Sequence, residues 1–236
     1  MKLKIYLFLI VLFGLDPIAK AQIWQPLGPD DFNQPTYTTI SDSDLAFNGS
    51  VPYIFHYNSW YYGDKGNKAV VMKYDASGVG WEKVESPVFS SKSPSFTKIA
   101  INEGVPYVFF ADETHYGAAT VMKLNKSGTS WEVVGKAGFS LGTYLISPSI
   151  AFNNGVPYVC YINGNSNGLT VMKLNANGTD WEVVGSNNIS YNYGTSSAFL
   201  AFNEGVPYIC FNGRIESTFE LRPIIMKLNV VQTGKW

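Results

Sequence analysis

Short apolar runs separated by turn residues make up most of the chain. Between residues 149 and 185 such runs cover 149–152, 156–162, 169–174 and 181–185, and Asn and Gly are frequent between them. Runs of this length bounded by turn signals are typical of β-strands. No stretch after residue 21 keeps a helical period. The pattern predicts an all-β protein built of short antiparallel strands.

The same pattern returns four times along the chain. Val-Pro-Tyr begins at Val51, Val105, Val156 and Val206, each time after a turn that contains Asn and Gly. Val-Met-Lys follows at Val71, Val121 and Val171, with Ile225-Met226-Lys227 as the fourth copy, and Trp-Glu follows at Trp81, Trp131 and Trp181. A four-stranded antiparallel unit repeated about every fifty residues is typical of a β-propeller blade.

We therefore expect a β-propeller of four four-stranded antiparallel blades. The expected blades cover residues 42–85, 96–135, 147–185 and 197–236, inside one domain that spans residues 22–236. The segment Trp24-Gln25-Pro26-Leu27-Gly28 parallels Trp131-Glu132-Val133-Val134-Gly135, so residues 23–28 would supply the strand that closes the ring. In the alternative, Trp236 begins the last strand of the fourth blade, and the chain is a fragment of a larger propeller.

The hairpin between the last two strands of each unit has a predictable register. A turn centred on residues 127–128 places Lys123 opposite Glu132 and Leu124 opposite Trp131. The same register pairs Lys73 with Glu82 and Lys173 with Glu182. Cross-strand ion pairs of this kind contribute about 0.2–1 kcal/mol each. Because the pair recurs in three units, we interpret it as structural rather than catalytic.

Two cysteines, Cys160 and Cys210, occupy the same position of successive units, where the other units have Phe55 and Phe109. A position that accepts Phe or Cys is typical of a packing site. Equivalent points on neighbouring units also lie too far apart for a disulfide. We expect two buried free thiols.

The N-terminus has the pattern of a secretory signal peptide over residues 1–21. Lys2 and Lys4 precede an apolar run of 11 residues, and Ala19-Lys20-Ala21 gives the small-x-small cleavage pattern. An 11-residue run is too short for a membrane span, which needs about 20 residues. The mature chain should begin at Gln22 and be secreted without a membrane span.

Composition narrows the class of partner. The chain of 236 residues is 46% hydrophobic, 15% aromatic and 15% charged, with a formal net charge of -1. It is too apolar for disorder and too neutral for electrostatic nucleic-acid binding. We expect a monomer that binds a glycan or a protein ligand, and no nucleic acid. No spacing of His, Cys, Asp or Glu indicates a metal, and no motif indicates a cofactor.

The repeat unit, from Val-Pro-Tyr through Val-Met-Lys to Trp-Glu, resembles repeats of secreted bacterial propeller proteins. It is broadly similar to sialidase and kelch-like propellers, and the resemblance covers residues 24–236. Residues 125–131 and 175–181, and more loosely 75–81, look like the Asp-box turn of sialidase-type propellers, which is structural in that family. Sialidase activity would imply three arginines on the substrate carboxylate. This chain has only Arg214 and Arg222, so sialidase activity is not expected.

The connections divide into two sets by position. Those between the first and second and between the third and fourth strands of each unit are repeated and stereotyped, whereas the others differ in length and chemistry. Variable loops on a fixed scaffold commonly carry function. The candidate ligand-binding residues in these loops are Trp60, Tyr61, Tyr62, Asp64, Asp112, Glu113, Tyr116, Arg214 and Arg222. The aromatic rings could stack on a sugar or peptide, and the charged groups could form hydrogen bonds.

Two functions remain open at this stage. The first is a secreted, non-enzymatic propeller that binds glycan or protein through the variable loops, which we favour because no acid/base constellation stands out. The second is a polysaccharide-acting glycoside hydrolase or lyase, which would need two carboxylates about 5–9.5 Å apart. Neither His56, which falls in a strand, nor His115 has the spacing of a catalytic triad. No catalytic residue can be assigned from the sequence, and enzymatic activity stays open.

Overall fold

The computed structural model describes residues 23–28, 38–60, 68–75, 77–78, 80–84, 95–189, 195–214 and 220–229. Side chains are described for most of these, with exceptions that include residues 58–60 and Arg214. The expected signal peptide lies outside the described residues. Within the described part of the chain, no helix is long and apolar enough to span a membrane.

Fifteen strands in the described residues form four antiparallel sheets in chain order. The first sheet contains β1 (Thr38–Asn48), β2 (Val51–Trp60), β3 (Lys68–Tyr74) and β4 (Trp81–Lys83). The second contains β5 (Ser95–Asn102), β6 (Val105–Asp112), β7 (Ala118–Leu124) and β8 (Trp131–Val133). The third contains β9 (Leu145–Asn153), β10 (Val156–Asn163), β11 (Gly168–Leu174) and β12 (Trp181–Val183). The fourth contains β13 (Thr195–Asn203), β14 (Val206–Arg214) and β15 (Leu221–Lys227), and a 3-10 turn, η1 (Glu113–His115), follows β6.

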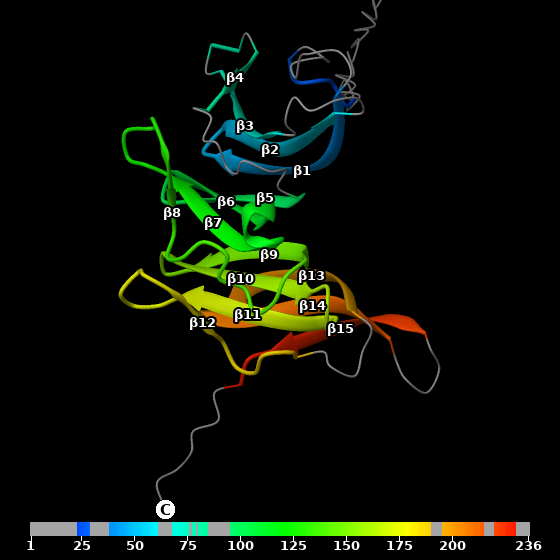
Figure 1. The fold of residues 1–236 in the computed structure, drawn as a ribbon. Coiled ribbons are helices and arrows are strands. Elements are labelled where there is room, and N and C mark those ends of the chain that lie inside the picture. The colour runs from blue at the N-terminus through cyan, green and yellow to red at the C-terminus, as the bar shows by residue number, and fades with distance from the viewer. Residues whose placement is uncertain are drawn as a thin grey trace, which may run out of the picture.

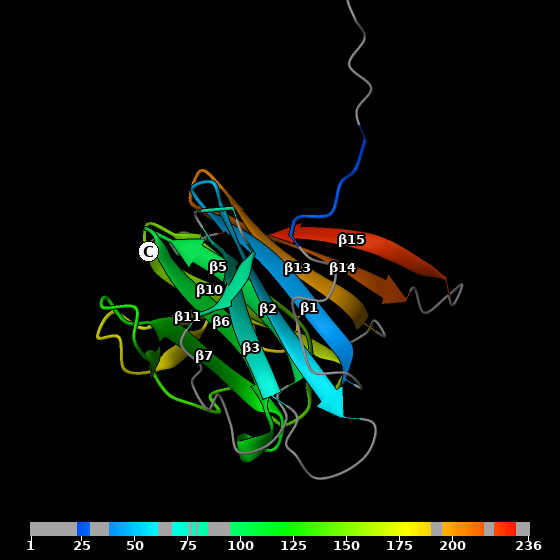
Figure 2. The ribbon, with the colours of Figure 1, turned by 90° about the horizontal axis from the view of Figure 1, so that it is seen from above.

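The sheets stack face to face, with the first and fourth at opposite ends (Figure 1). Their first strands contact one another in the order β1, β5, β9, β13, so these strands form the inner edge of the stack. A view along the stack shows β1–β3 crossing β14 and β15 at an angle, as twisted sheets do (Figure 2). The repeat therefore gives a propeller arrangement of blades.

Each of the three junctions between sheets has its own apolar core. Phe55 and Phe110 meet edge to face between the first and second sheets, with ring centroids 6.3 Å apart. Phe139 stacks on Trp181 between the second and third sheets. Cys160 packs with Phe211 between the third and fourth sheets. Because sheets are covered on both faces, the middle strands are apolar throughout instead of alternating.

Side-chain hydrogen bonds tie each inner strand to the next sheet. Asp44 Oδ2 accepts from Ile99 N at 2.8 Å, and Ser149 Oγ accepts from Leu200 N at 3.1 Å. Asp44 and Ser149 hold the same position of their repeats, seven residues before Val-Pro-Tyr. Because a serine performs the same role as Asp44, this carboxylate serves the junction between sheets.

The predicted hairpin register is confirmed in all three complete sheets, with Lys73 opposite Glu82, Lys123 opposite Glu132 and Lys173 opposite Glu182. Two of these pairs are ion pairs, at 2.9 Å in the first sheet and 3.1 Å in the third.

The turn that precedes each Trp is held by its leading residue. Asn125 Oδ1 accepts from Thr129 N at 2.9 Å, and Asn175 Oδ1 accepts from Thr179 N at 3.0 Å. These contacts fix the turn itself, which agrees with the structural role expected for the Asp-box segments.

The all-β architecture of propeller blades is confirmed, but ring closure is not detected in the described residues. The fourth sheet has three described strands, and the strand contacts run along the stack without joining β13–β15 to β1–β4.

Both cysteines are free, as expected. Cys160 is buried, and burial raises the pKa of its thiol to about 12. The expectation of a second buried thiol was wrong, because Cys210 is only half-buried. The fourth sheet covers Cys160, whereas among the described residues no further sheet covers Cys210.

Candidate functional site

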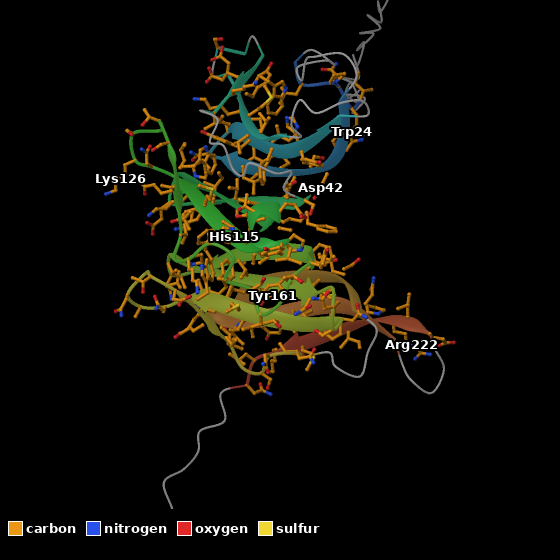
Figure 3. The ribbon with its side chains drawn as sticks, viewed as in Figure 1. Trp24, Asp42, His115, Lys126, Tyr161 and Arg222 are labelled. Atoms are coloured by element: carbon orange, nitrogen blue, oxygen red, sulfur yellow. The ribbon has the colours of Figure 1, made fainter. Side chains whose placement is uncertain are left out.

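Three variable loops lie at one end of the second and third sheets. We use the name variable rim for residues 112–117, 138–145 and 163–168. The first segment joins β6 to β7, the second leads from the second sheet into β9, and the third joins β10 to β11. Figure 3 places His115 in this region and Lys126, from a stereotyped turn, away from it.

A buried carboxylate organises the first segment of the rim. Asp112 ends β6 and is 3% exposed. Its Oδ1 accepts from Thr114 N at 2.9 Å and Thr114 Oγ1 at 2.5 Å, and its Oδ2 accepts from Thr120 Oγ1 at 3.1 Å. His115 Nδ1 lies 2.9 Å from the same Oδ2. A carboxylate surrounded by donors in this way is stabilised in its buried position.

The Asp112 contact decides which nitrogen of His115 is available. When a carboxylate accepts from Nδ1, the proton of the neutral ring resides on Nδ1 and Nε2 becomes the acceptor. The His115 side chain is about half exposed, at 46%. The pair thus presents an oriented imidazole at the rim, able to accept a hydrogen bond or a proton through Nε2.

The imidazole is also fixed from its other side. Gly138 N donates to Thr120 Oγ1 at 3.0 Å. A Cβ built on Gly138 would lie 2.9 Å from Cβ, Cγ and Cδ2 of His115, so the ring lies directly against this glycine. The backbone of Gly138 has a φ of 62°, which a glycine adopts without strain. A side chain at this position would displace the histidine.

Two exposed tyrosines stand beside this pair. Tyr116 and Tyr144 are 76% and 64% exposed, and each has a φ of 58°, in the left-handed region that bulky residues rarely adopt. Tyr144 N donates to Tyr116 O at 3.3 Å, and Leu145 N donates to Gly117 O at 2.9 Å. These hydrogen bonds join two loops from different sheets and fix the backbone of one tyrosine against the backbone of the other.

Glu113 lies at the same junction. A Cβ built on Gly117 would lie 3.3 Å from Tyr144 N and 3.6 Å from Glu113 Oε1. The carboxylate therefore lies close to the hydrogen bonds that join the two loops. It is only partly exposed.

The second rim segment is anchored on the third sheet. Leu141 N donates to Tyr161 OH at 3.0 Å, and Asn163 Nδ2 donates to Leu141 O. Asn165 Nδ2 donates to Thr143 Oγ1 at 2.9 Å. Burial raises the pKa of Tyr161, so its hydroxyl stays protonated and serves as a fixed anchor. The rim is thus a preformed surface instead of a set of independent loops.

The structure brings together three of the residues selected from the sequence: Asp112, Glu113 and Tyr116. Arg222 lies apart, at the end of the fourth sheet (Figure 3), where its Nη2 is 2.6 Å from Glu220 Oε2. Tyr61, Tyr62 and Asp64 lie outside the described residues. Trp60 ends β2 and Arg214 ends β14, but their side chains are not described.

Sequence reasoning missed His115 and Tyr144 as members of the site. The signal for His115 was the Asp-x-x-His spacing immediately after a strand, which lets the carboxylate reach Nδ1. Tyr144 had no local signal, because its partner Tyr116 belongs to the preceding repeat. Among the described residues, no group of three or more His, Cys, Asp or Glu is arranged to hold a metal ion.

Known proteins resemble this chain in fold and not in sequence. No family model matches it, and no curated protein sequence is similar to it. A Hadza microbial sialidase superposes with a TM-score of 0.56 at 13% identity, covering 83% of this chain and 45% of its own. A Bacillus megaterium levansucrase mutant superposes with a TM-score of 0.52 at 12% identity, covering 82% and 68%.

An exo-β-1,3-galactanase from Clostridium thermocellum superposes with a TM-score of 0.53 at 12% identity, covering 83% of this chain and 48% of its own. The likeness is one of fold. It confirms the expected resemblance to sialidase-type propellers, and at these identities it assigns no residue of this chain a role.

Proposed function

We propose that this protein binds carbohydrate through the variable rim. The observation that carries the proposal is the pair Tyr116 and Tyr144, two exposed rings on left-handed backbone that a hydrogen bond between the loops holds in place. Backbone strain at an exposed aromatic residue is typical of functional sites. A tyrosine offers an apolar face and a polar hydroxyl, which suits a sugar ring with its apolar and hydroxyl-bearing surfaces.

The polar groups of the rim support the same ligand class. Glu113, His115 Nε2 and the amide of Asn165 lie on the same rim segments as the tyrosines and provide acceptors and donors, which are the groups that hydroxyls need. Solved structures that resemble the chain include a sialidase, a levansucrase and a galactanase. These proteins are named for activities on carbohydrates. The names describe other proteins, and they support carbohydrate as the ligand class proposed for this chain.

A glycan array with the purified chain, followed by titration calorimetry on the best ligand, tests the proposal. The informative variants are Tyr116→Asn and Tyr144→Asn, because Asn tolerates the left-handed backbone while removing the ring. Each should weaken binding about tenfold, or about 1.4 kcal/mol. Lys126→Ala, in an exposed stereotyped turn away from the rim, is the matched control and should bind like the unchanged chain. Unchanged affinity in the double tyrosine variant would refute the proposal.

Hydrolysis is the second candidate. It is favoured by the Asp112–His115 pair, which leaves an oriented Nε2 for proton transfer, and by the enzymatic names of the similar structures. The preference for a non-enzymatic protein has no support from these comparisons. Incubating the bound glycan with the chain and measuring new reducing ends separates the two functions. Product that disappears in His115→Gln would establish hydrolysis; binding without product would leave a recognition protein.

We place this binding outside the cell, because residues 1–21 have the pattern of a signal peptide. Amino-terminal sequencing of the exported chain should begin at Gln22. Recovery of an uncleaved chain inside the cell would overturn this part of the proposal.

A further inference from the structure

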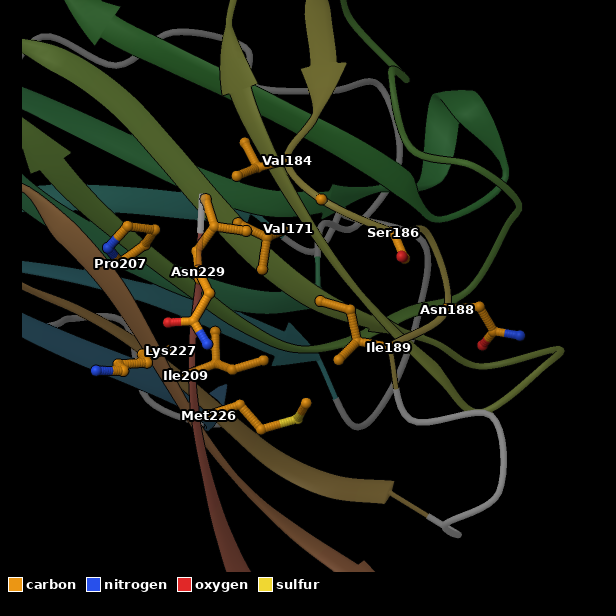
Figure 4. Close-up of a pocket in the computed structure, with 12 residues that line it drawn as sticks. Val171, Val184, Ser186, Asn188, Ile189, Pro207, Ile209, Met226, Lys227 and Asn229 are labelled. Carbon is orange, nitrogen blue, oxygen red and sulfur yellow. The ribbon is translucent and has the colours of Figure 1, made fainter. Parts of the chain in front are cut away.

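A cavity of 520 Å³ opens between the third and fourth sheets, on the side away from the inner strands. It lies between the segment that follows β12 and the last strand, β15 (Figure 4). Its walls include Val184, Gly185 and Ile189 on one side and Met226 and Leu228 on the other. Most of the residues that line it are apolar.

The same place between the second and third sheets is filled by an indole. Trp181, the first residue of β12, stacks on Phe139 with ring centroids 4.4 Å apart. Its Nε1 donates to Val134 O at 2.9 Å. Phe139 and Ile189 are equivalent, since Phe139 N donates to Ala119 O and Ile189 N donates to Leu169 O.

Gly135, between the second and third sheets, and Gly185, between the third and fourth, show how closely each junction is packed. A Cβ built on Gly135 would lie 2.9 Å from both Leu174 Cδ1 and Trp181 Nε1. A Cβ built on Gly185 would meet, within 4 Å among the described atoms, only Leu228 Cδ1 at 3.2 Å. Leu228 is the counterpart of Leu174, so among the described residues the neighbour that Gly185 lacks is the indole. The cavity therefore has the position of a socket for a tryptophan from a fourth strand.

The edge of the fourth sheet has the same vacancy in the described residues. In each of the other sheets the third strand pairs with a short fourth strand. Met226 of β15, which lines the cavity, is 41% exposed, whereas its counterpart Met172 is buried. An exposed apolar edge strand is a ready template for another strand.

Residues 24–28 have the features of the missing strand. Leu27 O accepts from Trp81 Nε1 at 2.9 Å, as Val134 O accepts from Trp181 Nε1. A Cβ built on Gly28 would lie 3.1 Å from Tyr74 and 3.2 Å from Trp81, as Gly135 lies against the third sheet. This segment thus stands where the fourth strand of a preceding sheet would end.

Trp24, at the start of that segment, has a side chain that packs against no neighbouring sheet in the described residues. It takes the place of Trp131 and Trp181 in the alignment of the repeats, yet it is fully exposed, whereas both of those residues are buried.

Residues 24–26 can pair with β15 in the register that the third and fourth strands of the other sheets adopt. Leu174 pairs with Trp181, Lys173 with Glu182 and Met172 with Val183. The same register sets Leu228 opposite Trp24, Lys227 opposite Gln25 and Met226 opposite Pro26.

Proline is acceptable at this point of the strand. Val184 N, one residue beyond the position equivalent to Pro26, donates to Val171 O at 2.9 Å. Because antiparallel bonds alternate along a strand, the N–H at the Pro26 position points away from the neighbouring strand. A residue without an N–H is tolerated there.

We propose that residues 24–26 of a second copy of this chain pair with β15 and insert Trp24 into the cavity between the third and fourth sheets. Within one chain, Trp24 and β15 lie at opposite ends of the stack, with two sheets between them (Figures 1 and 3). Each copy therefore carries the strand at one end and the socket at the other. A head-to-tail contact of this kind generates a ring if the rotation closes and a filament if it does not.

Cysteine crosslinking between two variants tests the contact directly. Gln25→Cys in one preparation and Lys227→Cys in another would face each other, with Cα atoms about 5.5 Å apart, within the range of a disulfide. Mixed and oxidised, the two should give a crosslinked dimer. Lys126→Cys mixed with Lys227→Cys is the control and should not. No dimer above that control would overturn the proposal.

One chain carrying both Gln25→Cys and Lys227→Cys distinguishes contact between copies from closure within a copy. At high dilution it should remain uncrosslinked. A crosslink formed inside the monomer would refute the second copy and identify closure of the ring by the chain's own segment.

Sedimentation of the unchanged chain gives a second measurement. Trp24→Ala should weaken self-association at least tenfold without changing the melting temperature of the dilute, monomeric chain, because the side chain is exposed in the single copy. Gln25→Glu should strengthen it a few-fold by restoring the Lys–Glu pair found in the first and third sheets. A chain that stays monomeric up to about 100 μM would overturn the proposal.

Discussion

The third and fourth sheets have nearly the same strands and very different surroundings. Both contain Val-Pro-Tyr, and both pair the tyrosine of that motif with the lysine of the next strand, Tyr158 with Lys173 and Tyr208 with Lys227. Met172 is nevertheless 3% exposed, whereas Met226 is 41% exposed. The comparison teaches that hairpin register follows from local sequence, while burial depends on whether another sheet and a fourth strand are present.

The largest expected difference between the sheets is in the free energy of unfolding lost when Met172 or Met226 is replaced. Met172→Ala should reduce the free energy of unfolding by about 2–5 kcal/mol, because it opens a cavity in a packed junction and removes the contact between Tyr161 OH and Sδ. Met226→Ala should change it by less than about 0.5 kcal/mol. Urea denaturation at a concentration where the chain is monomeric gives both values. Equal losses would mean that the fourth sheet is as well covered as the third.

The two cysteines give an intermediate difference, in reactivity. Burial raises the pKa of Cys160 to about 12, so at pH 8 only about one thiol in ten thousand is ionised. Thiolate is the reactive form, and Cys210 is half-buried. Alkylation at pH 8, followed by mass spectrometry of the peptides, should modify Cys210 at least about 100-fold faster. The Cys210→Ser chain is the control, and rapid labelling of Cys160 in it would show that the junction opens.

The smallest expected difference in stability concerns Lys173 of the third sheet and Lys227 of the fourth. Lys173→Ala should cost about 0.2–1 kcal/mol, because Lys173 Nζ lies 3.1 Å from Glu182 Oε1. Lys227→Ala should cost nothing measurable, since no described strand pairs with the outer edge of β15, the edge at which Glu182 pairs with Lys173 in the third sheet. Glu182 raises the pKa of Lys173 above its usual 10.5.

This shift fixes the pH dependence of the pair. A raised pKa contributes stability that is complete below pH 10.5 and is lost as the pH rises through the folded value. Unfolding curves for the unchanged chain and Lys173→Ala should therefore converge above pH 10.5. A gap that persists in strong alkali would mean that packing of the Lys173 stem, and not the ion pair, stabilises the sheet.

The strands and their pairing could be predicted because they depend on near neighbours. In the third unit the expected strand at 156–162 corresponds to β10, and the expected strand at 169–174 corresponds to β11. Apolar runs bounded by Asn- and Gly-containing turns specify such hairpins locally. The Lys–Glu register followed from the turn length for the same reason.

The candidate site could be predicted only in part. The change from stereotyped to variable loops identified the rim, and Glu113 and Tyr116 lie on it. The joining of Tyr116 to Tyr144 and the support of His115 by Gly138 connect different repeats, and no local pattern in either segment reveals these contacts.

The sequence by itself determined the all-β class, the four repeats and the position of the variable loops, because hydrophobic periodicity and turn residues act over a few residues. Only the tertiary structure decided which repeated positions are buried, since burial depends on the neighbouring sheet. Cys160 and Cys210 share one position of the repeat and differ in exposure for that reason. The tertiary structure also decided that Trp24 is exposed and that a cavity lies between the third and fourth sheets where, among the described residues, no indole lies. Neither follows from the repeat, because packing of a fourth strand depends on contacts between segments far apart in the sequence.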